Sequence, residues 1–277
     1  MDSGSLSSFY DELLKIAGEL DVAAMERFTK GLRPGDLIQF EAQAPDVMRA
    51  SLRRGTAHQL ISKPIQTVTG SPQHHTAMYV GTDPKTGQHL IAHSYEQGGR
   101  AGVVIEPVDK YGRSVKLHAL RPSGVTPQQA ASAAEEAKVM AFKPTSYSTR
   151  NLLGAGVYEL GEKAPRGRMS GALKRMGSMV VGRVCDPGTG ICSQLPTDAY
   201  SRVLGKVQAV RQLVGEGVSS PEAHVGITPG RLARSPTMQS LGTYAPAKPE
   251  ASTIRAAGGR LKDLMKSVAK KVVTRGH

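Results

Sequence analysis

The sequence predicts an α+β protein built around a small antiparallel sheet. Three observations carry this prediction: a block of short alternating segments between residues 73 and 122, a helix directly after it, and a second helix that starts near residue 192. Within the block, residues 76–80 and 90–93 have strand character, and a turn containing Pro and Gly separates them. Because strands joined by short turns run antiparallel, the block is predicted to be a meander.

The chain before the meander is predicted to hold one or two helices and one strand. Apolar side chains recur at helical spacing through residues 6–30. The dipeptide Pro34-Gly35 then breaks the helix, and residues 37–40 form a strand. Residues 41–72 are polar and irregular, so they are interpreted as an insertion with a short helix around residues 45–54.

The chain after residue 100 completes the sheet and adds helices. Residues 103–107 and 115–122 are the next two strand candidates. Thr126 and Pro127 suit the N-cap and first position of an Ala-rich helix. Residues 143–182 are rich in Gly and basic side chains and are interpreted as a second insertion. The helix after residue 192 has an inward face predicted from helical spacing, namely Leu195, Ala199, Val203 and Val207.

These elements predict one folded domain with an extension at each end. Residues 1–31 form the helical N-terminal extension, and residues 32–242 form the domain, with residues 41–72 and 143–182 as its insertions. Residues 243–277 are predicted to be a linker and a basic amphipathic helix.

The charge of the chain is strongly positive and is concentrated near its C-terminus. The formal net charge is +13, and residues 252–277 alone carry seven Lys or Arg against one Asp. This segment is either a solvated basic tail or a surface that attracts an anionic partner such as nucleic acid, teichoic acid or phospholipid. No nucleic-acid-binding motif or interleaved aromatic pattern is present, so sequence-specific recognition of DNA or RNA is not predicted.

The sequence offers no sign of membrane insertion or secretion. No run of about 18 apolar residues occurs, and the first residues lack the basic and apolar regions of a signal peptide. We therefore expect synthesis in the cytoplasm. The two cysteines, Cys185 and Cys192, flank a turn and could form a local disulfide, but free thiols in a reducing compartment are the simpler expectation. Zinc would need two more ligands.

Cys192 and two histidines are the candidates for chemistry. A cysteine that opens a helix sits at the positive end of the helix dipole, which favours the thiolate. His75 and His93 lie in the two strands of the first hairpin, and an imidazole can accept the thiol proton and return it to a leaving group. Taken alone, each residue is more often structural. Their combination indicates nucleophilic catalysis.

A metal site is the alternative use of the histidines. His74, His75, His89 and His93 could gather a metal ion. However, neighbouring residues of a strand point to opposite faces, so His74 and His75 cannot both converge on one ion. Neither a metal nor another cofactor is therefore predicted.

Four segments together resemble the core motifs of the NlpC/P60 cysteine peptidases. They are Gly35-Asp36-Leu37-Ile38, His75-Thr76-Ala77-Met78-Tyr79-Val80-Gly81, Ile91-Ala92-His93-Ser94 and Cys192-Ser193-Gln194-Leu195. In that family the cysteine helix usually comes first, whereas here it follows the histidine strands. The order resembles the circularly permuted, YiiX-like branch of the papain-like superfamily, which includes poxvirus relatives. Residues 227–236 also resemble the distal end of that branch, so the resemblance covers residues 32–242.

The resemblance implies a fold and a set of roles. The fold is papain-like, with the nucleophile helix packed on a small antiparallel sheet. Cys192 would be the nucleophile, His75 the general base and His93 the third polar residue. Because the permuted relatives often use a glutamate in the third role, Glu96 is a rival to His93. Pro196 is tolerated only in the first turn of a helix, which places the helix start close to Cys192.

The function that the resemblance implies is a cysteine hydrolase acting on an amide bond, most directly in the stem peptides of peptidoglycan. A basic protein suits such an anionic cell envelope. Residues 9–17 resemble the openings of bacteriophage structural proteins, which leads to the hypothesis of a virion component that opens the cell wall. Two alternatives stay open. One is a thioesterase or acyltransferase acting on lipids, and the other is a non-catalytic structural protein that docks into a larger assembly through its terminal helices.

Overall fold

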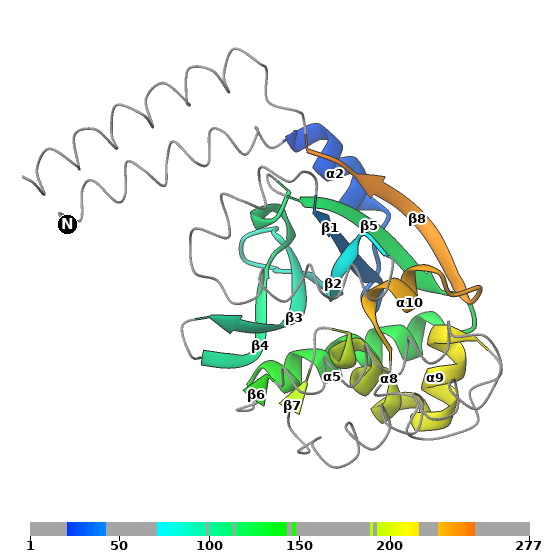
Figure 1. Ribbon diagram of the computed structural model, residues 1–277. Coiled ribbons are helices and arrows are strands. Elements are labelled where there is room, and N and C mark those ends of the chain that lie inside the picture. Colours follow the sequence, from blue (N-terminus) through cyan, green and yellow to red (C-terminus); the bar gives the residue numbers. More distant parts are fainter. Residues whose placement is uncertain are drawn as a thin grey trace, which may run out of the picture.

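The computed structural model describes residues 21–42, 71–97, 100–112, 115–142, 146–147, 189–190, 193–215 and 227–246. Within them, six strands form one antiparallel sheet in the order β4-β3-β2-β1-β5-β8 (Figure 1). The strands are β1 (Leu37–Ala42), β2 (Gln73–Thr82), β3 (His89–Gln97), β4 (Arg100–Pro107), β5 (Val115–Pro122) and β8 (Met238–Tyr244). The α+β class and the antiparallel sheet predicted from the sequence are confirmed, and β2, β3 and β4 follow one another as a meander. The prediction is wrong for the fourth strand of the block, because β5 does not lie beside β4 but pairs with β1.

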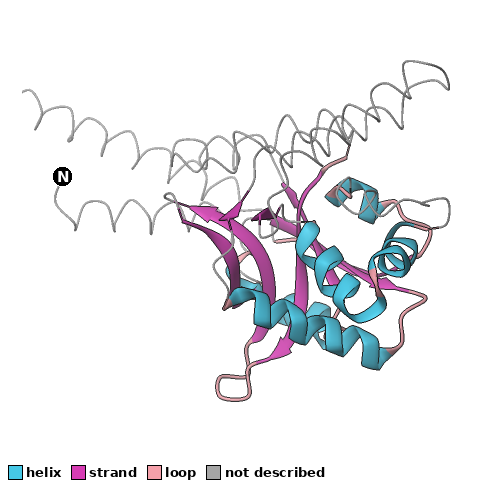
Figure 2. Ribbon diagram, turned by 90° about the horizontal axis from the view of Figure 1, so that it is seen from below, coloured by secondary structure: helices cyan, strands magenta, loops and turns pink. Residues whose placement is uncertain are grey.

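Helices lie on both faces of this sheet. One face carries a layer of four helices, which Figure 2 shows in front of the strands: α5 (Pro127–Ala141), α8 (Gln194–Leu204), α9 (Lys206–Val214) and α10 (Pro229–Ala233). The opposite face is covered by α2 (Val22–Lys30) and by the 3-10 turn η1 (Val108–Lys110). Two short strands, β6 (Ser146–Tyr147) and β7 (Thr189–Gly190), pair in parallel as a separate ladder.

Local sequence signals placed several elements correctly. β5 has the predicted bounds. The N-cap of α5 is Thr126, whose side chain accepts a hydrogen bond from the backbone of Gln129, while the Gln129 side chain accepts one in return from the backbone of Thr126. This capping box satisfies two backbone donors that the first turn of a helix leaves unpaired. The start of α8 at Gln194 also agrees with the position of Pro196 in a first turn.

Two differences from the sequence prediction concern the helices after residue 192 and the last strand. The predicted helix is divided at Gly205, whose φ of +81° is a conformation that glycine adopts readily. Val207 therefore lies in the next helix and is 37 % exposed, rather than on a buried stripe with Leu195 and Ala199. β8 was not expected at all. It extends to Tyr244, past the predicted domain boundary at residue 242.

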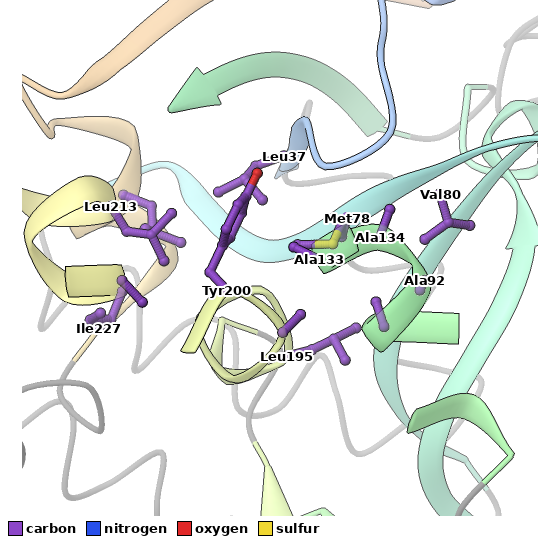
Figure 3. Close-up of a cluster of buried hydrophobic side chains, with 14 of the residues drawn as sticks. Leu37, Met78, Val80, Ala92, Ala133, Ala134, Leu195, Tyr200, Leu213 and Ile227 are labelled. Carbon is purple, nitrogen blue, oxygen red and sulfur yellow. The ribbon is translucent and has the colours of Figure 1, made fainter. Parts of the chain in front are cut away.

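The core is divided by the sheet into two apolar layers. Leu37 of β1 lies opposite Met78 of β2 and Leu120 of β5, and all three face the helical layer. Figure 3 shows this cluster, in which Leu37, Met78, Leu195 and Tyr200 come from the sheet and from α8. The alternate strand positions build the second layer, whose members include Met25, Ile38, Phe40, Ala77, Ile91, Leu117 and Tyr244.

The turn before β1 joins the sheet to both long helices. Gly35 has a φ of +95°, and a Cβ atom there would lie 2.5 Å from the carbonyl oxygen of Ala130 in α5. The hydroxyl of Tyr200 in α8 donates to the Gly35 carbonyl oxygen at 2.8 Å. Next to it, buried Asp36 binds the guanidinium of Arg121 in β5 through both carboxylate oxygens, at 2.8 and 2.7 Å. This bidentate contact raises the pKa of Arg121.

Several predicted segments lie outside the described residues. They include the first part of the N-terminal helical extension, the short helix around residues 45–54, nearly all of both insertions and the basic helix within residues 243–277. Among the helices that the structure describes, none combines the length and the apolar character needed to cross a bilayer.

Replacing Gly35 by alanine is expected to lower the free energy of unfolding by about 3 kcal/mol. The added methyl group meets both an unfavourable φ and the backbone of α5, so strain and overpacking act together. Gly87→Ala is the matched control, because Gly87 also has a positive φ but no atom within 4 Å of the added Cβ. It should cost about 1 kcal/mol. Urea unfolding of both variants measures the difference, and equal losses would contradict the proposed close approach of β1 and α5.

Candidate active site

His75 and His93 lie just past one end of the registered ladder between β2 and β3. The backbone pairs between β2 and β3 run from Met78–Ala92 to Thr82–His89, so both histidines lie beyond the last pair. At these positions the registered backbone partners belong to the other neighbouring strand, which is β1 for β2 and β4 for β3. His75 pairs with Phe40 of β1, and His93 pairs with Val104 of β4. The two side chains therefore meet just beyond the last registered pair of β2 and β3.

The two imidazoles are in direct hydrogen-bond contact. Nε2 of His75 lies 3.0 Å from Nδ1 of His93, and the rings are nearly perpendicular, at 86°. The side chain of His93 is only 2 % exposed. Such a bond needs one nitrogen that donates and one that accepts, so at least one of the two rings is neutral whenever the bond is formed. The structure thus brings together the two histidines that the sequence assigns to one site.

A tyrosine and a glutamate extend the hydrogen bonding beyond His93, and neither was predicted from the sequence as a site residue. The hydroxyl of Tyr111, which follows η1, lies 2.9 Å from Nε2 of His93. The same hydroxyl donates a short hydrogen bond to Oε2 of Glu106 in β4, and this oxygen is also 3.4 Å from His93 Nε2. Lys110 binds the other carboxylate oxygen of Glu106 at 2.5 Å. A continuous polar path thus runs from His75 to a carboxylate.

Glu106 is ionised over the whole physiological range. Hydrogen bonding to His93 is the largest influence, and contacts with Lys110 and Tyr111 act in the same direction against the cost of burial. Together they lower the pKa of Glu106 from its usual value of 4.5 to about 2. At the end of the path, therefore, stands a group that can accept hydrogen bonds but cannot donate them.

Phe40 supports this polar path from the side of β1. Its ring is 2 % exposed and contacts His75 and Tyr111 edge-on, at centroid distances of 5.0 and 5.1 Å. Edge-on contacts between rings are among the favourable aromatic geometries, and they restrict how far each ring can turn. Phe40 consequently limits the rotation of the His75 and Tyr111 rings.

The start of α8, which carries the cysteine motif, packs on the other face of the sheet. Leu195 and Tyr200 belong to the helical layer, whereas His75 shares a face with Phe40. Ser193, the N-cap residue of α8, is fully buried and donates through its hydroxyl to the carbonyl oxygen of Ile227 at 2.5 Å. On the preceding side, β7 pairs with β6, which packs against β3 and β4. Cys192 itself and Cys185 lie outside the described residues.

The remaining sequence candidates are placed as follows. Glu96, the rival for the third role, pairs through its backbone with Ala101, and its side chain lies outside the described part of the structure. His89 lies at the far end of the hairpin, where its Nδ1 is 2.7 Å from the Tyr79 hydroxyl. His74 is next to His75 in β2 and so has the opposite orientation. Within the described residues, no group of three or more His, Cys, Asp or Glu could hold a metal ion.

Glu106 and Tyr111 could not be identified from the sequence because their role depends on tertiary placement. Glu106 reaches His93 only through the register of β3 on β4, in which His93 lies opposite Val104. Tyr111 is brought back over the sheet by the η1 turn. The only local sign of Glu106 in the sequence is a carboxylate near the end of a largely apolar strand. Such a residue is usually exposed to solvent and has no special role.

Comparison of the chain with protein-family models, with curated proteins and with solved structures gives no match.

Replacing Glu106 by glutamine is expected to reduce the free energy of unfolding in a pH-dependent way. The folded-state pKa of about 2 lies below the usual 4.5, so the stabilisation by the carboxylate is present above pH 4.5 and is lost as the pH falls toward 2. We expect a loss of about 2 kcal/mol at neutral pH, discounted for partial solvent access, that shrinks over this acidic interval.

Urea unfolding at several pH values between 2 and 7 measures this difference. Glu135→Gln is the control, since Glu135 is 68 % exposed and pairs with Lys138 on the surface of α5. That variant should stay within about 0.5 kcal/mol of the parent throughout. A Glu106→Gln effect of the same size at every pH would show that lost packing, rather than lost charge, explains the variant.

Proposed function

We propose that this protein is a cysteine hydrolase that cleaves an amide bond, on a permuted papain-like fold of the NlpC/P60 type. Cys192 is the nucleophile, His75 the general base and His93 the residue that orients His75. The observation that supports this most strongly is the 3.0 Å contact between His75 and His93. Two histidines 18 positions apart, assigned to consecutive roles by motif alone, meet with the nitrogen-to-nitrogen geometry that those roles require.

The proposed reaction uses one proton carrier. Nδ1 of His75 takes the proton from the Cys192 thiol, and the thiolate attacks the carbonyl carbon of the amide. The protonated imidazole then gives its proton to the leaving amine as the C–N bond breaks, which leaves a thioester on Cys192. A water molecule, deprotonated by His75, then attacks the carbonyl carbon of the thioester, and the C–S bond breaks to release the acid. The sulfur of Cys192 takes the proton back from His75, which restores the starting state.

The geometry sets one condition on this reaction. α8 begins at Gln194 against the helical face of the sheet, while His75 faces the other layer. The proposal therefore requires the thiol of Cys192 to reach His75 past the last registered pair of β2 and β3, Met78 with Ala92.

The charge of the chain supports an anionic substrate. A net charge of +13 raises the local concentration of polyanions and speeds encounter with them. Among amide-containing polymers, cross-linked peptidoglycan with its attached anionic polymers fits this charge, and its stem peptides supply the scissile bonds. Esters and thioesters of lipids would react by the same acyl transfer, so they are the second substrate class to test.

A non-catalytic structural protein on the same fold is the alternative function. The observation that favours it is the packing of α8 on the face opposite the histidine pair. In that case the polar path from His75 to Glu106 would serve to fix the sheet, and the cysteine would have no partner base.

Replacing Cys192 by alanine is expected to abolish hydrolysis, whereas Cys185→Ala should retain nearly full activity. The assay measures the release of new amino groups from purified peptidoglycan, with a long-chain acyl thioester tested in parallel. The cysteine pair is its own matched control, because both variants remove one thiol from the same region of sequence. Loss of activity in Cys185→Ala, with Cys192→Ala active, would contradict the assignment.

The rate of iodoacetamide labelling at Cys192 tests the chemistry without a substrate. We expect half-maximal labelling at a pH well below the ordinary thiol pKa of about 8.5, and a rise toward that value in His75→Ala. Labelling that is slow at every pH and indifferent to His75 would overturn the proposed enzyme and leave the structural protein.

A further inference from the structure

The geometry points to Glu106 and Tyr111 as positioning residues that fix the proton arrangement of the histidine pair, so that His75 presents an unprotonated Nδ1. The consequence for catalysis rests on the proposed function, whereas the proton arrangement itself does not. Neither residue belongs to the motifs that led to the catalytic assignment.

The two oxygens of the Glu106 carboxylate have different partners. Oε1 is engaged by the ammonium group of Lys110, and Oε2 receives the Tyr111 hydroxyl proton. Oε2 is also the oxygen that faces His93, at 3.4 Å from its Nε2. An ionised carboxylate can only accept hydrogen bonds. Glu106 therefore determines which atom donates and which accepts in each hydrogen bond between it and His75.

Tyr111 determines which atom donates in its hydrogen bond with His93. Its hydroxyl has one proton, and that proton lies toward Glu106. The opposite assignment would place two bare oxygens in close contact with no proton between them. The Tyr111 oxygen therefore accepts, and Nε2 of His93, at 2.9 Å, is the donor.

The protonation of His93 in turn determines which nitrogen of His75 carries a proton. A neutral His93 that is protonated on Nε2 has its lone pair on Nδ1, which lies 3.0 Å from Nε2 of His75. Nε2 of His75 must consequently carry the proton, and its lone pair is on Nδ1. This is the tautomer that can accept a thiol proton, and the anionic carboxylate at the other end of the path favours the positive charge that His75 then acquires.

Without the carboxylate, the path has no preferred direction. The tyrosine could turn its proton toward His93, which would then donate from Nδ1 to Nε2 of His75. His75 would carry its proton on Nδ1 and would be unable to act as the base. We therefore expect Glu106→Gln, whose amide can donate to Tyr111, to populate this reversed arrangement.

Nitrogen-15 NMR of the histidine rings in the full-length protein tests the inference directly. In the parent protein, His75 and His93 should both carry their protons on Nε2 at a pH where they are neutral. In Glu106→Gln, His75 should shift toward the Nδ1-protonated form, and Tyr111→Phe should broaden or shift the His93 resonances. Variants His75→Gln and His93→Gln assign the signals.

Glu41→Gln is the matched control. Glu41 is a strand glutamate that binds a different histidine, His118, at 2.6 Å on the face of the helical layer. Its replacement should alter the resonances of His118 and leave those of His75 and His93 unchanged. Circular dichroism of all the variants establishes that each is folded. Unchanged His75 and His93 tautomers in folded Glu106→Gln would overturn the inference.

Kinetics separate this inference from the proposed function. If the enzyme assignment holds, Glu106→Gln should lower kcat by about 10- to 100-fold with little change in KM, as is typical when a partner that orients a histidine is lost. A parent protein with the stated tautomers but no hydrolysis would overturn the enzyme and support the proton arrangement. An active parent, dependent on Cys192 and His75, whose kcat survives Glu106→Gln would overturn the positioning role alone.

Discussion

The buried ion pair between Asp36 and Arg121 is the interaction on which the rest of this fold depends. Asp36 is nearly inaccessible to solvent, and besides Arg121 it accepts a hydrogen bond from the backbone of Arg33 at 2.7 Å. Removing one partner of such a pair would leave an unpaired buried charge, which costs far more than the pair contributes. The pair joins the start of β1 to the end of β5. Through the neighbouring carbonyl of Gly35, it also lies beside the point where Tyr200 attaches α8 to the sheet.

This junction determines where the histidines lie. Once Leu37 is fixed opposite Met78, the antiparallel register places Phe40 opposite His75. The central position of β1 then lets Phe40 support both His75 and Tyr111 from one side. The Gly-Asp-Leu motif is therefore a structural element with a consequence for the site: it sets the register, and the register sets which side chains can reach one another.

Local signals in the sequence were enough for the elements that satisfy their own hydrogen bonds or follow a simple period. The capping box at Thr126 and the alternation through β5 are examples. Sequence patterns did not predict the features that depend on contacts between distant parts of the chain. β8 is polar and Gly-containing, so only its pairing with β5 identifies it as a strand. The same reason applies to Glu106, whose role arises from the β3–β4 register and not from the residues around it.

The sheet also separates the two parts of the proposed active site, the histidine pair and the start of α8. On one face an ionised carboxylate, a tyrosine and two histidines form a path with a defined direction, and on the other face α8 begins at a buried Ser193. The proposed hydrolase therefore requires a group carried by the segment before Ser193 to reach the imidazole of His75 past the last registered pair of β2 and β3, Met78 with Ala92. The structural protein makes no such demand, because each face of the sheet is packed by its own apolar layer.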